Sequence, residues 1–132
     1  LSAEEVTQPW CKMLFAGPPE RIVQMASYCE SHALEGARFV RSADVYFEML
    51  PDGVTKASGL EELLDVTHFR RENVYAIGDY YNDRELICAA GVSAVPENAP
   101  DELRALADLT VCHCYEGAVA DFIAWIENKL RG

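Results

Sequence analysis

The sequence predicts an α/β protein in which residues 51–132 form a parallel sheet and residues 1–50 have α+β character. From residue 54 onward, short apolar runs alternate with helical patterns and are joined by short links. Such alternation is typical of right-handed strand–helix–strand units, whose parallel sheet is covered by helices on both faces. Before residue 51, a single helical pattern is followed by two strand-like runs three residues apart, which indicates a hairpin.

The first third of the chain predicts a strand, a helix and the hairpin, in that order. Residues 12–16 read as a short strand, and Pro19 suits the first turn of the helix that follows. The hairpin strands are expected in residues 38–41 and 45–50. The turn signal Pro-Asp-Gly at residues 51–53 marks the expected boundary between the two parts of the chain.

The second part predicts four helices and three strands. The helices are expected in residues 56–66, 83–90, 100–107 and 117–130, and the strands in residues 74–77, 92–95 and 109–112. The last helix has the clearest pattern, because its apolar residues recur on a single stripe.

Composition argues against several classes of function. The net charge is −11, with 22 acidic against 11 basic residues, which disfavours a broad surface for nucleic acid or anionic lipid. No apolar run approaches a membrane span, and the acidic start does not resemble a signal peptide. The five cysteines lie in apolar segments, so we expect reduced core residues in a cytoplasmic protein. Because the chain starts at leucine rather than methionine, we expect a piece of a longer product.

The stretch that ends the first strand of the second part carries three polar side chains. Gly78-Asp79 closes an apolar run, and Asn82-Asp83 follows directly before a helix. Open α/β sheets bind ligands at the carboxyl ends of their strands. Clustered carboxylates repel one another unless they hold a cation, so a hard divalent metal is the natural partner. The alternative is a strand-end turn with a helix cap, although a cap needs only one such residue.

Lys56 stands where a helix is expected to begin. A cation there opposes the positive end of the helix dipole at a cost of about 0.3–1 kcal/mol. An anion bound between the lysine and the helix terminus would reverse that cost. The alternative is a solvated surface lysine.

These residues together resemble the C-terminal half of a haloacid-dehalogenase-like phosphohydrolase, and most closely a Cof-type phosphatase with a large α/β cap. The resemblance is carried by Lys56, by the run Gly78-Asp79-Tyr80-Tyr81-Asn82-Asp83, and by Asn98-Ala99 ahead of a helix. It implies a three-layer, Rossmann-like partial core in residues 51–132 and the end of the cap in residues 1–50.

The resemblance also implies roles for individual residues. Lys56 would steady the substrate phosphate and act in catalysis, and Asp79 would act in catalysis by binding Mg²⁺. Asn82 would contact the phosphate, and Asp83 would support the metal site. The implied reaction is Mg²⁺-dependent hydrolysis of a small phosphorylated metabolite, sugar phosphates included, through an aspartyl-phosphate.

The chain departs from the family pattern at its start. The family's nucleophile lies in an N-terminal Asp-x-Asp motif, and no Asp-x-Asp occurs in these 132 residues. We therefore expect the chain to be inactive alone. The alternatives are a non-catalytic metal-binding, phosphate-binding or assembly module, and a split enzyme whose nucleophile arrives on another chain. The family's first strand would lie beside residues 74–77, so its absence predicts an unpaired edge and self-association.

The residues before Asn98 depart from the family pattern. The preceding Val95-Pro96-Glu97 replaces the apolar-Met-Gly run that is usual in the family. Capping of the helix that follows is therefore the alternative interpretation for Asn98.

Two further groups of residues could carry chemistry. Cys112-His113-Cys114 would suggest zinc, but a fourth ligand is missing and alternate strand residues point to opposite faces. Tyr80 and Tyr81 either shape a substrate entrance or pack over the end of the sheet.

Overall fold

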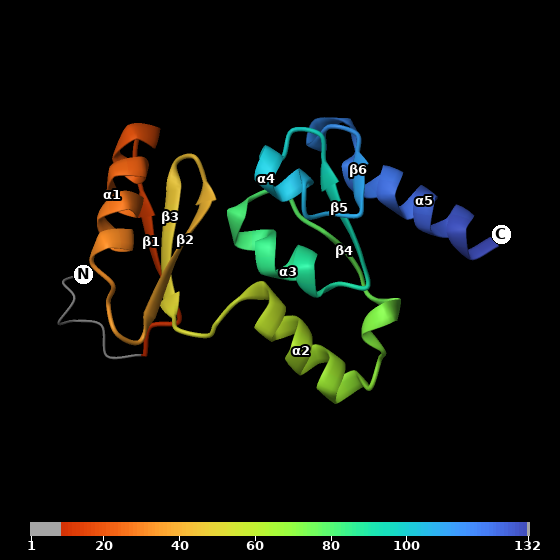
Figure 1. Cartoon of the computed structure of the whole chain (residues 1–132), viewed down its shortest axis with the longest axis horizontal. Helices are drawn as coiled ribbons and strands as arrows, with labels where there is room; N and C mark the ends of the chain where they lie inside the picture. Colours follow the sequence, from red (N-terminus) through yellow and green to blue (C-terminus); the bar gives the residue numbers. More distant parts are fainter. Residues whose placement is uncertain (1–8, 132) are drawn as a thin grey trace. The chain divides into compact units, whose positions relative to one another are not determined.

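The computed structural model describes residues 9–131 and divides into two compact units (Figure 1). The first unit is Leu1–Val54 and the second unit is Thr55–Gly132. Every helix and strand expected from the sequence is present, with differences of a few residues at some ends.

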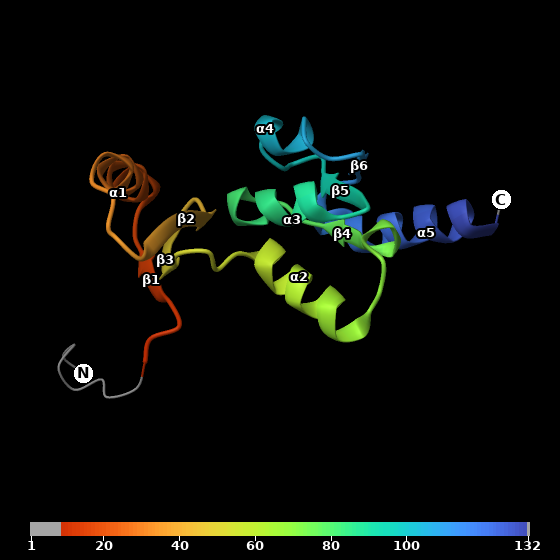
Figure 2. The ribbon, with the colours of Figure 1, turned by 60° about the horizontal axis from the view of Figure 1, so that its bottom comes forward.

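The first unit is one helix on a three-stranded antiparallel sheet. Its elements are β1 (Met13–Ala16), α1 (Pro19–Ser31), β2 (Ala37–Ala43) and β3 (Tyr46–Pro51), with strand order β1-β3-β2. Figure 2 shows α1 end-on beside this sheet. The rings of Phe15 and Phe39 both contact Phe47, which is buried, so aromatic packing joins the three strands. The predicted hairpin is confirmed, and the assignment of this unit to a cap domain stays a prediction.

The second unit contains a parallel sheet. Its helices and strands are α2 (Lys56–Thr67), β4 (Tyr75–Ile77), α3 (Arg84–Ala89), β5 (Val92–Pro96), α4 (Asp101–Arg104), β6 (Leu109–Val111) and α5 (Ala118–Arg131). Three short 3₁₀ turns separate them, namely η2 (Arg71–Asn73), η3 (Tyr81–Asp83) and η4 (Cys114–Glu116). The strand order is β4-β5-β6, and both pairs are parallel.

Helices cover both faces of this sheet. Side chains of the central strand β5 alternate between the faces, as strand geometry requires. Ala94 packs with Phe122 of α5, whereas the neighbouring Val95 packs with Ile87 of α3 and with Leu103 of α4. The second unit is therefore a three-layer α/β arrangement with its core on either side of β5, and the predicted fold class is confirmed.

For three of the element ends that differ from the sequence prediction, hydrogen bonds of the structure show the cause. β6 stops at Val111, since the backbone N–H of Cys112 donates to the Asp121 carboxylate at 3.0 Å instead of continuing the strand. α4 stops at Arg104, and the chain is then held to β5 where Ser93 donates to Asp108. α3 begins one residue late because the preceding turn η3 is closed by its own contacts.

Across residues 9–131, no helix combines the length and the apolar character that crossing a lipid bilayer would require.

Candidate active site at the end of β4

A capping box places Lys56 at the first position of α2. The Thr55 hydroxyl accepts the backbone N–H of Ser58 at 2.9 Å, and the Ser58 hydroxyl accepts the backbone N–H of Thr55 at the same distance. This reciprocal pair satisfies donors that the helix start would otherwise leave open. The Lys56 ammonium then forms an ion pair with the carboxylate of Asp83, 27 residues along the chain. The structure thus brings the predicted lysine to the motif that follows β4.

Asp83 holds the loop between β4 and α3. One carboxylate oxygen pairs with Lys56, and the other accepts the backbone N–H groups of Asp79 at 3.0 Å and Tyr80 at 3.3 Å. Asp83 is only 4% exposed, so these three donors replace the water that an isolated carboxylate would need. Asp83 therefore folds the loop onto itself and points its outer oxygen at the lysine.

Gly78 makes this turn possible. A Cβ atom at position 78 would lie 2.4 Å from the Cβ and 2.6 Å from the Cγ of Asp83. No real side chain fits that distance, so the glycine is required by the close approach of Asp83 to the end of β4.

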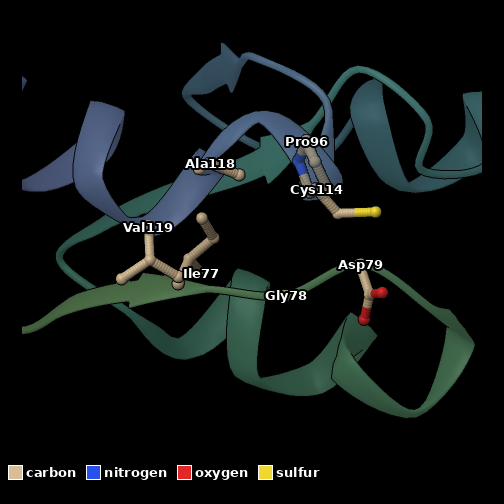
Figure 3. A pocket seen from close by; sticks show the side chains of 8 residues that line it. Ile77, Gly78, Asp79, Pro96, Cys114, Ala118 and Val119 are labelled. Carbon is tan, nitrogen blue, oxygen red and sulfur yellow. The ribbon is translucent and has the colours of Figure 1, made fainter.

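Asp79 differs from Asp83 in that its carboxylate is free. Within the described part of the chain, the Asp79 side chain makes no hydrogen bond or ion pair. It lies at the edge of a pocket of about 280 Å³ at the carboxyl end of β4 (Figure 3). The pocket is lined by Ile77, Gly78, Asp79, Pro96, Cys114, Gly117, Ala118 and Val119. Figure 3 shows Asp79 and Cys114 at one end of it and the aliphatic side chains of Ile77 and Val119 at the other.

Asn82 lies in η3 between these two aspartates. It is half-buried, and its carboxamide has no hydrogen-bond partner among residues 9–131. Neither Asn82 nor Lys56 lines the pocket. Asp79, Asn82 and Asp83 nevertheless lie in the segment that follows β4, and the ion pair with Asp83 brings Lys56 of α2 to this segment.

The donor set fits a Mg²⁺ ion only in part. Mg²⁺ prefers oxygen ligands in octahedral geometry and often takes one or two carboxylates from a protein. Asp79 offers one free carboxylate, whereas both oxygens of Asp83 already accept hydrogen bonds. Among the described residues, no three His, Cys, Asp or Glu side chains gather in a metal-binding arrangement. Further ligands would have to be water, phosphate oxygens or groups from outside residues 9–131.

Two pocket features were missed by sequence reasoning. Cys114 lines the wall opposite Asp79, and the Asn98 carboxamide oxygen accepts the Cys114 backbone N–H at 2.9 Å. The capping interpretation of Asn98 is wrong, because α4 begins after Pro100 without a side-chain cap. Asn98 instead ties the loop after β5 to the loop after β6. No local signal indicates a contact between residues 16 positions apart.

The Cys112-His113-Cys114 segment is a turn and not a strand. The ring Nδ1 of His113 accepts the backbone N–H of Tyr115 at 3.2 Å and lies 3.7 Å from the Cys114 sulfur. Burial raises the pKa of the Cys112 thiol, and the carboxylate of Asp121 adds to the effect. Among residues 9–131, no three His, Cys, Asp or Glu side chains gather around this turn, so the structure does not support the zinc interpretation.

Tyr80 and Tyr81 pack against each other with their ring centroids 5.0 Å apart in an edge-to-face arrangement. Neither ring lines the pocket.

Comparison with known proteins agrees with this fold. A profile of the haloacid dehalogenase-like hydrolases matches residues 1–123. An HMP-PP phosphatase of Serratia proteamaculans is 29% identical over 120 residues, and one of Yersinia enterocolitica is 31% identical over the same length. Each alignment covers 89% of this chain and 44% of the relative.

A solved structure of a haloacid dehalogenase-like hydrolase from Bacteroides thetaiotaomicron gives the same result. It superposes with a TM-score of 0.75 at 31% identity, covering 93% of this chain and 46% of its own. The chain thus spans less than half the length of these relatives. Because the family profile matches nearly all of the sequence, the chain belongs to the haloacid dehalogenase-like hydrolases.

Proposed function

We propose that this chain supplies the C-terminal part of a Mg²⁺-dependent phosphatase that hydrolyses small phosphomonoesters, sugar phosphates included, through an aspartyl-phosphate. One observation carries the proposal. The ammonium of Lys56 is held by Asp83 at the end of β4, where the carboxylate of Asp79 is left free. Phosphatase relatives at 29% and 31% identity support the reaction class.

Each residue has a role that follows from its contacts. Lys56, whose side chain is half exposed, can donate a hydrogen bond to a phosphoryl oxygen on its open side while Asp83 fixes its position. Asp79 would hold Mg²⁺, and the half-buried Asn82 would donate its amide to the phosphate. When bound, Mg²⁺ supplies positive charge against the phosphoryl oxygens. Asp83 acts as a positioning residue, because both of its oxygens are already engaged.

The chain still lacks a nucleophile for this reaction. Attack by a carboxylate on phosphorus breaks the ester P–O bond, and the leaving alkoxide takes a proton as the aspartyl-phosphate forms. Water then hydrolyses that intermediate and releases phosphate. Lysine and Mg²⁺ stabilise charge but do not attack, and no Asp-x-Asp occurs in the 132 residues. We therefore expect this polypeptide to bind phosphate and metal without turnover.

Two measurements test the proposal. With p-nitrophenyl phosphate and Mg²⁺, the isolated chain should release no p-nitrophenol above the blank. Turnover that disappears in Asp79→Ala would show that the chain carries its own nucleophile. In a titration with inorganic phosphate and Mg²⁺, Lys56→Met should weaken phosphate binding by about tenfold, whereas Lys129→Met on α5 should not. Equal effects of the two variants would contradict the role of Lys56.

A further inference from the structure

The turn η4 carries a tyrosine whose ring is almost fully open to solvent. Tyr115 is 93% exposed, more than any other large apolar or aromatic side chain in residues 9–131. Its ring stacks on the imidazole of His113, with the two centroids 5.4 Å apart and the planes inclined by 29°. A side chain this exposed adds little to the apolar burial that stabilises the fold. The pair therefore presents a stacked aromatic surface whose contribution to folding is small.

Hydrogen bonds fix the backbone that carries this pair. The N–H of Cys114 donates to the Asn98 carboxamide oxygen at 2.9 Å, and the N–H of Tyr115 donates to Nδ1 of His113 at 3.2 Å. The N–H of Glu116 donates to the His113 carbonyl at 2.8 Å. Three successive N–H groups of the turn are thus satisfied, one of them by the imidazole itself. A ring on a backbone held in this way loses less conformational freedom when a ligand binds to it.

The aromatic pair lies beside the candidate active site. Cys114, the residue directly before Tyr115, lines the wall of the pocket opposite Asp79 (Figure 3). The turn η4 follows β6, which β5 separates from β4 in the sheet, so the pair is not part of the outer edge of β4. A ligand whose phosphate is held near Asp79 can therefore extend its organic part past Cys114 toward the ring of Tyr115.

The pocket offers few partners for a ligand with many hydroxyl groups. Asp79 is the only charged side chain among its lining residues, and the others are aliphatic, glycine or the Cys114 thiol. A hydroxyl group that leaves water without a new hydrogen bond costs free energy, whereas a planar ring has far less polar surface to desolvate. The lining therefore favours an unsaturated ring over a polyol as the organic part of the ligand.

We propose that the His113–Tyr115 pair is a stacking surface that selects phosphomonoesters whose organic part is a planar unsaturated ring. The inference rests on the proposed phosphatase function of the Asp79 site and names the substrate class that this site takes. Stacked aromatic rings attract each other beyond the area that they bury, and a sugar lacks a comparable π-face. Tyr115 is then a specificity residue that contacts the organic part of the substrate, and His113 is the residue that positions its ring.

A titration with three probes tests the selection. Phenyl phosphate, glycerol 1-phosphate and inorganic phosphate are each added to the intact chain with Mg²⁺, and affinities are measured from backbone amide resonances. Phenyl phosphate should bind about fivefold more tightly than glycerol 1-phosphate. Tyr115→Ala should abolish this difference, and Tyr115→Phe should keep it because the ring remains. Loss of so exposed a side chain leaves the packing of the fold intact.

A second tyrosine–histidine stack provides the matched control. Tyr28 on α1 is 63% exposed and stacks on His32 with the centroids 4.2 Å apart, but it belongs to the first unit and does not line the pocket. Tyr28→Ala should leave all three affinities unchanged. Equal affinities of the wild type for phenyl phosphate and glycerol 1-phosphate would overturn the proposal. So would an equal loss of phenyl phosphate binding in Tyr28→Ala and Tyr115→Ala.

One further variant separates this proposal from the phosphatase function on which it rests. Lys56→Met should weaken the binding of all three probes alike, whereas Tyr115→Ala should weaken the binding of phenyl phosphate alone. Inorganic phosphate binding that does not depend on Lys56 would refute the proposed phosphate site. Phosphate binding that depends on Lys56, together with phenyl phosphate binding that does not depend on Tyr115, would refute the ring selection alone.

Discussion

Replacing Asp83 by alanine should loosen the loop after β4 and release Lys56. Asp83 is the one side chain that holds Lys56, the Asp79 N–H and the Tyr80 N–H together in the described structure. Its removal leaves the two backbone donors without their acceptor at a site that is nearly closed to water. Asp83→Asn provides the comparison, because its amide oxygen can still accept from both N–H groups while the ionic contact with Lys56 is lost.

The size of the loss follows from the exposure of each partner. A buried N–H that loses its acceptor costs about 1–3 kcal/mol, toward the lower end where the loop can admit water. The Lys56 side chain is 49% exposed, so its ion pair contributes about 0–1 kcal/mol. We therefore expect Asp83→Ala to lower the free energy of unfolding of the second unit by about 2–4 kcal/mol, and Asp83→Asn by about 1 kcal/mol.

Tryptophan fluorescence can report on the second unit alone. The sequence has two tryptophans, Trp10 in the first unit and Trp125 on α5, where its ring packs on Phe122. A Trp10→Phe background leaves Trp125 as the only reporter. Urea unfolding followed at Trp125 then gives the free energy of unfolding for wild type, Asp83→Asn and Asp83→Ala.

We expect a small loss in the free energy of unfolding for Asp83→Asn and a larger loss for Asp83→Ala. If Asp83→Ala lowered the free energy of unfolding by less than about 0.5 kcal/mol, the ordinary range for a surface substitution, Asp83 would not hold the loop. If Asp83→Asn and Asp83→Ala lowered the free energy of unfolding equally, the two backbone hydrogen bonds would not be the main contribution of Asp83 to stability.

Two other substitutions test the surroundings of the site. Gly78→Ala should lower the free energy of unfolding by about 1–3 kcal/mol in the same urea assay, because its Cβ would overlap Asp83. Gly59→Ala, with open space around it, should be neutral or stabilising. Equal effects of the two substitutions would contradict the packing explanation. The backbone N–H and hydroxyl of Ser93 hold the pKa of Asp108 below its usual value, so this carboxylate contributes stability above about pH 4 that is lost as the pH falls through its folded pKa. Asp108→Asn should therefore lose less stability than wild type between about pH 6 and about pH 3, and identical pH profiles in urea unfolding would refute this.

The fold could be predicted because its signals are local. The alternation of apolar runs and helical patterns after residue 54 depends on side-chain periodicity, which the sequence displays directly. Element ends could not be placed as well, because they depend on contacts between distant residues. β6 ends where Asp121 takes the Cys112 N–H, and α4 ends near the point where Ser93 binds Asp108.

The site could be predicted only where its residues form a recognisable spacing. The Gly78–Asp83 run could be recognised from its glycine, its two carboxylates and the strand before it. The partner of Lys56 could not be deduced, since Asp83 is 27 residues away and only the folded loop brings the two together. The pocket wall formed by Cys114 and held by Asn98 gave no signal at all, because that contact exists only in the tertiary structure.

The most direct test of the proposed metal site is a Mg²⁺ titration observed through backbone amide resonances. Because 22 acidic residues offer weak sites over the whole surface, site-resolved shifts are needed rather than total binding. We expect Mg²⁺ to shift the resonances of residues 78–83, with an affinity that falls by about tenfold, or about 1.4 kcal/mol, in Asp79→Asn. Asp65→Asn, which removes an exposed carboxylate on α2, should leave that affinity unchanged. Shifts at residues 78–83 with the same affinity in Asp79→Asn would contradict the assignment of Asp79 as the residue that holds Mg²⁺.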